Sequence, residues 1–269
     1  MAGLRTASLR ARAAALEAVH RDIRALHMPG LVGPPVHGPP VLSRIFLLGQ
    51  APGPHEARFG RPFAWTAGKT LFRWFGGALG ATEAEFRDRV YMAAVVRAFP
   101  GKTAGGGDRV PSPAEIEASR GFIVREIGIL RPRLVVPVGR LAIEQVLGRG
   151  VRLEDVVGRR VRARYHGLAV DVVALPHPSG ASTWFKVEPG RALLARALRV
   201  LARHPEIRRA CPGRRGRPAA APRPPGVGAA RRRSRPAPPS GDPRRPTDAP
   251  RRQPRARSAA PRMPRTATR

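Results

Sequence analysis

Two short polar segments of the sequence carry side chains that could do chemistry. The first is Gly49–Gly53, Gly-Gln-Ala-Pro-Gly, and Glu56 follows it closely. The second is Pro176–Gly180, Pro-His-Pro-Ser-Gly, with His177 at its centre. Histidine and glutamate are among the side chains that most often transfer protons in active sites. Each segment could also be only a tight turn at the end of a strand, so the surrounding elements decide between the two interpretations.

Both segments follow short apolar runs that are typical of buried strands. Residues 43–49 precede the first segment and residues 167–175 precede the second, and two further runs of this kind span 89–99 and 132–139. Continuous apolar strands separated by helices are typical of parallel sheets that are covered on both faces. The pattern therefore predicts an α/β fold, a three-layer αβα sandwich around a mostly parallel four-stranded sheet.

Helical patterns separate these strand candidates. Start and stop signals predict helices in residues 66–80, 112–130, 140–148 and 188–204, and apolar spacing predicts another in the first 26 residues. In such sheets ligands bind beyond the carboxyl ends of the strands, where the strand order reverses. Both polar segments emerge at that edge, so we expect them to face one crevice.

The composition divides the chain into three parts. We expect residues 1–40 to hold the first helix and a Pro/Gly-rich connection, residues 41–206 to form the α/β domain, and residues 207–269 to form an Arg/Pro-rich tail. The tail has 19 arginines, two aspartates and no aromatic residue. Such a stretch buries too little apolar surface to offset the entropy of ordering it, so we expect it to be disordered.

The chain is strongly basic, with 50 Lys and Arg against 18 Asp and Glu and a net charge of +32. This charge predicts a polyanion partner, most simply nucleic acid, with the tail adding salt-sensitive affinity. The alternative is compositional drift, because only three of the cations are lysine and the chain is rich in Ala, Gly, Pro and Arg.

A single cysteine, Cys211, excludes an intrachain disulfide and any multi-cysteine metal or iron–sulfur site within one chain. The sequence has no apolar run long enough to span a membrane, and its first 30 residues lack the continuous apolar core of a signal peptide. We expect a cytoplasmic monomer that needs no metal or cofactor.

A partial phosphate-loop pattern occurs in residues 63–70, Phe-Ala-Trp-Thr-Ala-Gly-Lys-Thr. Phe63 occupies the place of the first glycine, and the buried strand that should precede such a loop is absent from the pattern. A nucleotide hydrolase is therefore the weakest of the functional hypotheses, and Gly68 is better explained by close packing at a helix start.

Several short motifs in a fixed order resemble the uracil-DNA glycosylase superfamily, most closely its bacterial family 4 branch. The resemblance covers about residues 41–202. It rests on Gly49–Gly53, the acid Glu56, Gly60-Arg61-Pro62-Phe63, Ala67-Gly68, the third strand and the late His-Pro-Ser segment.

The resemblance implies roles for these residues in extruding a base from DNA and cleaving it from its sugar. His177 would donate to the base carbonyl oxygen, where negative charge develops, and Glu56 would activate a water or stabilise the sugar cation. Base-binding residues would be Gln50, Ala51, Phe63 and Ala94, with Phe63 providing a stacking face. Flanking phosphates would contact Pro52, Gly53, Ser179, Gly180 and Ser182.

The sequence departs from the family 4 pattern at several positions. The four cysteines of the iron–sulfur cluster are missing, and Ala98 and Ser119 stand where two of them are expected. Ala94 replaces the asparagine that reads the edge of uracil, so the selectivity for uracil loses its main polar group. Gln50 replaces a glutamate and cannot act as a general base.

These observations predict a monofunctional DNA glycosylase of base-excision repair that acts on uracil or a related deaminated base in damaged or single-stranded DNA. The alternative, motivated by Ala94 and Gln50, is a catalytically weak or inactive member that binds nucleic acid without excision.

Overall fold

The computed structural model describes residues 2–180 and 182–212. All structural observations below concern this part of the chain, which lies within Met1–Ala219. Residues 213–269, which include most of the expected basic tail, lie outside the described residues, as does Ala181.

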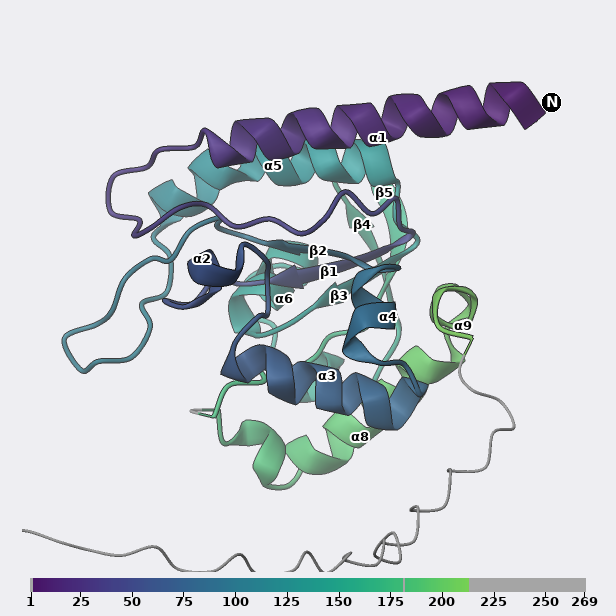
Figure 1. Ribbon diagram of the computed structural model, residues 1–269. Coiled ribbons are helices and arrows are strands. Elements are labelled where there is room, and N and C mark those ends of the chain that lie inside the picture. The colour runs from purple at the N-terminus through teal and green to yellow at the C-terminus, as the bar shows by residue number, and fades with distance from the viewer. Residues whose placement is uncertain (1, 181, 213–269) are drawn as a thin grey trace, which may run out of the picture. The chain divides into compact units, whose positions relative to one another are not determined.

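A five-stranded sheet forms the centre of the fold (Figure 1). Its strands are β1 (Ile45–Gly49), β2 (Tyr91–Ala94), β3 (Leu134–Pro137), β4 (Val161–Tyr165) and β5 (Leu168–Val172), in the order β2-β1-β3-β5-β4. Strand β1 is parallel to β2 and β3, β3 is parallel to β5, and β4 is antiparallel to β5. The sheet is therefore mostly parallel, as predicted.

The expected number of four strands was wrong, because the sequence pattern does not mark β4. This edge strand alternates between exposed arginines, Arg162 and Arg164, and less exposed residues, so it has no continuous apolar run. It joins β5 through a two-residue turn at His166 and Gly167, whose φ angles of 44° and 81° are both positive. Such turns suit the right-handed twist of a hairpin.

Helices cover both faces of the sheet, which confirms the three-layer architecture (Figure 1). One face packs against α1 (Ala2–Arg24), α5 (Pro113–Leu130) and part of α6 (Arg140–Leu147). The other packs against α3 (Thr66–Leu79) and α8 (Gly190–Arg203). Shorter elements complete the fold: α2 (Glu56–Phe59), α4 (Glu83–Arg87), α7 (Leu153–Val156), α9 (Pro205–Ala210) and the 3₁₀ helix η1 (Trp184–Lys186).

Helix α9 extends the folded part beyond the boundary expected at residue 206. Ile207 and Cys211 are buried in the core cluster on the α3 side of the sheet. Residues 207–212 thus belong to the domain rather than to the tail. Within the described part of the chain, no helix is both long and apolar enough to cross a membrane.

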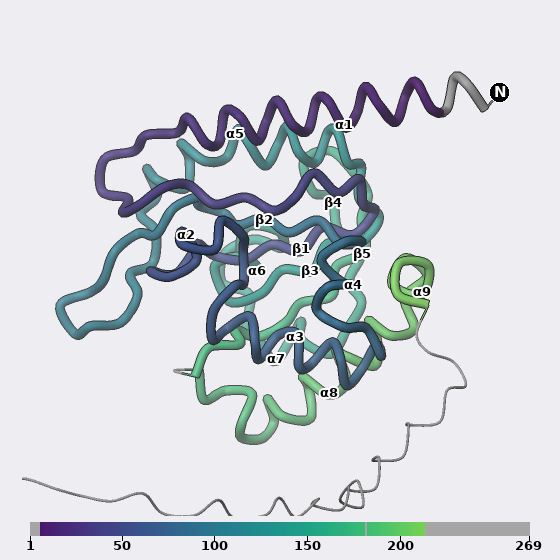
Figure 2. The backbone as a smooth tube through the Cα atoms, viewed as in Figure 1, coloured from purple at the N-terminus to yellow at the C-terminus, as the bar shows by residue number. Residues whose placement is uncertain are grey.

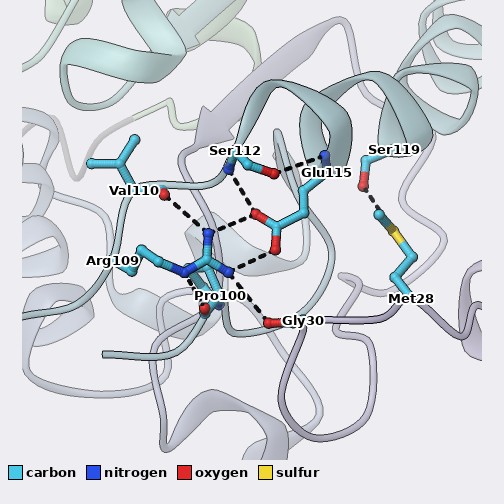
Figure 3. A network of polar contacts seen from close by, with 8 residues as sticks. All are labelled: Met28, Gly30, Pro100, Arg109, Val110, Ser112, Glu115 and Ser119. Atoms are coloured by element: carbon cyan, nitrogen blue, oxygen red, sulfur yellow. Dashed lines mark hydrogen bonds and ion pairs between the residues drawn. The ribbon is translucent and has the colours of Figure 1, made fainter. Parts of the chain in front are cut away.

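An ion pair ties the loop after β2 to the start of α5 (Figure 3). Arg109 donates to both carboxylate oxygens of Glu115, at 2.6 and 2.9 Å, and to the carbonyl oxygens of Pro100 and Gly30. Glu115 also completes a capping box with Ser112. The hydrogen bond from Arg109 is the main reason that the pKa of Glu115 falls to about 2. The helix start predicted at Ser112 is confirmed, and the loop is anchored at that end.

A buried polar network joins α1, β2 and α5. Glu126 accepts from Tyr91 Oη at 2.7 Å and from Arg97 Nη2 at 2.6 Å, and Tyr91 Oη accepts from His20 Nε2 at 2.9 Å. The side chains of Arg97 and Glu126 are 0% exposed. Burial is the main cause that lowers the pKa of His20 to about 4, so this histidine joins the network as a neutral ring.

Candidate active site

The carboxyl ends of β2, β1, β3 and β5 lie at one edge of the sheet, because these strands are parallel. Strand β1 lies between β2 and β3: the chain moves from β1 to β2 on one side and then crosses to β3 on the other. The order of the strands reverses there, which is where open α/β sheets bind ligands. The loops that carry Gln50 and His177 follow β1 and β5, so both predicted segments emerge at this edge.

Glu56 is the first residue of α2, and its side chain turns back toward the β1 loop. It is 7% exposed and accepts a hydrogen bond from the backbone N–H of Gly53 at 2.5 Å. Burial raises its pKa above 4.5, and hydrogen bonds from the backbone, including that of Trp65, oppose the rise. Within the described residues Glu56 forms no ion pair with its exposed neighbours Arg58 and Arg61. It is a buried, backbone-held carboxyl group.

His177 is half-buried beside Gly139, which follows β3. Its Nδ1 accepts a hydrogen bond from the backbone N–H of Ser179 at 3.3 Å. Because Nδ1 is an acceptor there, the neutral ring carries its hydrogen on Nε2. Burial lowers the pKa of His177 below 6.5. The arrangement provides a neutral imidazole with one N–H available to a ligand.

Gly139 must be a glycine for His177 to lie where it does. Its φ is +89°, a conformation that other residues rarely adopt, and a Cβ built on it would lie 3.1 Å from His177 Cδ2. The close approach of the β3 end to the His177 ring thus depends on this residue.

Phe63 covers the carboxyl end of β1. A Cβ on Gly49 would lie 2.8 Å from Phe63 Cζ, and one on Gly68 would collide with the Phe63 carbonyl oxygen. Arg87 holds the segment by donating to the carbonyl oxygens of Pro62 and Phe63, at 2.9 and 2.8 Å. Phe63 is only partly buried and packs against the core cluster on the α3 side, and its role as a wall of the site stays a prediction. The role predicted for Gly68 as a packing glycine agrees with this geometry.

The other residues predicted to bind the base lie around the same strand ends. Ala94 is 5% exposed and pairs with Gly49 in the sheet register. Gln50 is half-buried, and its carbonyl oxygen accepts from the N–H of Val96 at 3.1 Å. Ala51 packs against the core cluster on the α1 and α5 side. The structure brings these residues together, and their roles stay predictions.

The residues predicted to contact phosphates belong to two loops at this edge. Pro52 is buried and Gly53 is half-buried in the β1 loop. In the loop after His177, the N–H of Ser182 donates to Ser179 at 3.1 Å, and Lys186 Nζ donates to the carbonyl oxygen of Gly180 at 3.1 Å. The N–H of Ser179 is already bonded to His177, so it is less available to a phosphate.

Asp108 is an acidic group at the site that sequence reasoning missed. It belongs to the Gly-rich loop between β2 and α5, and Figure 2 shows this loop on the side of the molecule where α2 lies. A Cβ built on Gly53 would lie 3.9 Å from Asp108 Oδ2. Its charge helps to raise the pKa of Glu56 and, against the effect of burial, that of His177. The only signal in the sequence was a lone acid within a loop of glycines and cations.

The described residues do not fit an iron–sulfur cluster. Ala98 and Ser119 are buried, and Ser119 Oγ contacts Met28 Sδ at 4.0 Å (Figure 3). Cys211 is the only cysteine in the chain and packs in the core. Among residues 2–180 and 182–212 no group of three His, Cys, Asp or Glu side chains is placed to hold a metal ion.

The partial phosphate loop does not form a phosphate-binding loop. Lys69 and Thr70 lie in the first turns of α3, and a turn rather than a strand precedes them. The carbonyl oxygen of Phe63 lies against Gly68, where backbone N–H groups would have to face a ligand.

Comparisons with known protein families and with individual proteins both match uracil-DNA glycosylases. The family model of the uracil DNA glycosylase superfamily matches residues 35–202. Proteins named type-4 uracil-DNA glycosylase are similar: that of Pyrobaculum aerophilum is 31% identical over 139 residues, and that of Sulfurisphaera tokodaii is 29% identical over 143. These matches cover 50% and 52% of this chain and 66% and 61% of the relatives. The chain therefore spans somewhat less than two thirds of their length.

Proposed function

The chain belongs to the uracil-DNA glycosylase superfamily, and from this premise we propose that it is a monofunctional DNA glycosylase that hydrolyses the N-glycosidic bond of uracil or a related deaminated base. The observation that carries the proposal is that a neutral His177 and a buried Glu56 both belong to loops at the carboxyl edge of the sheet. Asp108 lies close enough to both to affect their pKa values.

In this mechanism the bond between the base nitrogen and C1′ of the sugar breaks, and its electron pair leaves with the base. Negative charge develops on the base carbonyl oxygen, to which His177 Nε2–H donates. A fixed donor in a water-poor site stabilises such charge strongly. The oxygen of a water then bonds to C1′, and the released proton passes to the Glu56 carboxylate.

The base would stack on Phe63 and lie against Ala94 and the Gln50 loop. Alanine offers no hydrogen bond to a base edge, so discrimination among deaminated bases would be weaker than in a site with an amide at that position. We propose that Gln50 and the backbone of Ala51 provide the remaining polar contacts, and that the substrate range extends beyond uracil.

DNA is the proposed partner, bound by a monomer in the cytoplasm. Phosphates flanking the lesion would contact the two loops at the carboxyl edge through Pro52, Gly53, Ser179, Gly180 and Ser182. The net charge of +32 would add affinity that falls steeply with salt.

The full chain should cleave at least one lesion in a panel of end-labelled oligonucleotides. The panel would carry uracil, hypoxanthine, xanthine or normal bases, in single and double strands, and alkali would reveal abasic sites. Cleavage at a lesion, absent with normal bases, supports the proposal. Salt-dependent binding without cleavage of any substrate would overturn it in favour of a nucleic-acid-binding member of the superfamily.

The Asp108→Asn variant should shift the acid limb of the pH–rate profile to lower pH. Excision needs an ionised Glu56 and a neutral His177, so the rate falls as either group gains a proton. The charge of Asp108 raises both pKa values, and its removal lowers both. Charge pairs at exposed sites are worth about 0.2–1 kcal/mol, which corresponds to about 0.2–0.7 pH units.

The measurement is kcat/KM between pH 4.5 and 8 for the two proteins. Asp155→Asn is a suitable control, because Asp155 is an exposed carboxylate in α7 that pairs with Arg152. A limb that stays in place or moves to higher pH in Asp108→Asn would contradict the assignment of Asp108 to the site.

A further inference from the structure

Three ring side chains form a partly exposed cluster beside the candidate site. Phe59 and Trp65 stack with ring centroids 5.8 Å apart and an interplanar angle of 26°, and His55 lies 4.7 Å from Trp65. Phe59 is 46% exposed and Trp65 is 39% exposed. They are the only aromatic residues among the exposed large apolar side chains of the described part of the chain. We call His55, Phe59 and Trp65 the aromatic cluster.

The local backbone brings these rings together. Helix α2 is a single turn that ends at Gly60, whose φ of +59° reverses the chain direction. The chain returns through Phe63 to Trp65, which is the N-cap residue of α3. The side chains on α2 and at the start of α3 therefore meet on the surface instead of in the core.

The charges around the aromatic cluster are positive. Lys69 Nζ lies 5.6 Å from the Trp65 ring centroid. Arg58 and Arg61 are exposed, and neither side chain forms a hydrogen bond or ion pair within residues 2–180 and 182–212. Glu56 is the only acid in residues 55–70, and it is buried against the backbone. Such a surface suits a single-stranded nucleic acid: its exposed base faces would stack on the aromatic rings, and its phosphates would be attracted by the cations.

The aromatic cluster is physically connected to the candidate site. The backbone of Trp65 lies close enough to the Glu56 carboxyl group to help oppose the rise in its pKa. Phe63, the proposed stacking wall, lies two residues before Trp65. A nucleotide bound on the cluster would therefore lie next to one whose base is in the site.

We propose that the aromatic cluster is a stacking platform for unpaired bases that neighbour the target nucleotide, so that the enzyme favours single-stranded DNA. The identity of the target nucleotide rests on the proposed function. The stacking of neighbouring bases on the cluster does not depend on it. In a duplex the faces of the neighbouring bases are covered by their own stack, whereas an unpaired strand offers them to aromatic side chains.

The test compares binding of lesion-free oligonucleotides, single- and double-stranded, to wild type, Trp65→Ala and Trp65→Phe. We expect single strands to bind wild type more tightly, and Trp65→Ala to weaken that binding about tenfold, the effect typical of one lost base stack. Duplex binding should change less than about twofold, and Trp65→Phe should keep most of the affinity. Single strands should quench the tryptophan fluorescence of wild type more than that of Trp65→Phe.

Val124→Ala, at an exposed apolar residue of α5, is the matched control. Thermal unfolding of each variant establishes that it is folded. Equal losses for single and double strands, or no loss in Trp65→Ala, would overturn the inference. Because the oligonucleotides carry no lesion, this outcome is independent of excision. If the protein cleaves uracil but Trp65→Ala binds single strands as wild type does, only the stacking platform is refuted. If Trp65→Ala loses affinity for single strands but no lesion is cleaved, only the proposed glycosylase activity is refuted.

Discussion

Replacement of His177 by alanine is expected to lower the rate of base excision about 10²- to 10³-fold, the usual effect of removing one donor to a developing oxyanion. The Nε2–H of His177 is the donor that the geometry leaves free, since Nδ1 is bonded to the backbone of Ser179. The ground-state base carries little charge on its carbonyl oxygen, so DNA binding should change less than the chemical step. Single-turnover rates with excess enzyme, and dissociation constants for the same oligonucleotide, measure the two effects separately.

His27→Ala is the control for this variant, because His27 is exposed and lies after the end of α1. Its excision rate should match that of wild type. An unchanged rate in His177→Ala would remove His177 from the mechanism. A loss of binding as large as the loss of rate would assign it to substrate binding instead.

The Glu126→Ala variant is expected to lower the free energy of unfolding by about 3–5 kcal/mol, because it leaves the Arg97 guanidinium buried without its partner. Tyr91 would also lose its acceptor. For a domain of this size the loss corresponds to a fall in Tm of about 6–20 °C. Thermal and urea unfolding of the full chain would measure it.

An ion pair on the surface of the same helix provides the control. Glu117 and Arg120 are both exposed and 3.5 Å apart, so Glu117→Ala should cost less than about 1 kcal/mol. The double variant Arg97→Met with Glu126→Leu should recover much of the loss, since it removes both buried charges. An equal cost at Glu126 and Glu117 would contradict the central role of the buried pair.

Strands with continuous apolar runs could be predicted from the sequence, and the edge strand could not. Strands β1 and β3 are buried on both faces, so their apolar character shows directly in the sequence. Strand β4 has one face in solvent and carries arginines there, and the turn signal at His166 and Gly167 is weak without an asparagine or aspartate.

The part of the candidate site that could be predicted from the sequence is the part whose position follows from the ends of the strands. The loops with Glu56 and His177 follow β1 and β5, and the parallel sheet places them at one edge. The position of Asp108 depends instead on how a long loop returns to the sheet, which local sequence does not encode. The partnership of Arg97 with Glu126 likewise joins residues far apart in the chain and is visible only in three dimensions.

The buried network that holds α1 has a consequence for synthesis on the ribosome. Helix α1 is made before its partners Tyr91 and Glu126, the second of which follows by about 100 residues. At translation rates of about 5–20 residues per second, the helix waits about 5–20 s for them. During that interval its apolar side, with Leu16 and Ile23, has no sheet to cover it and is open to chaperones and to neighbouring nascent chains.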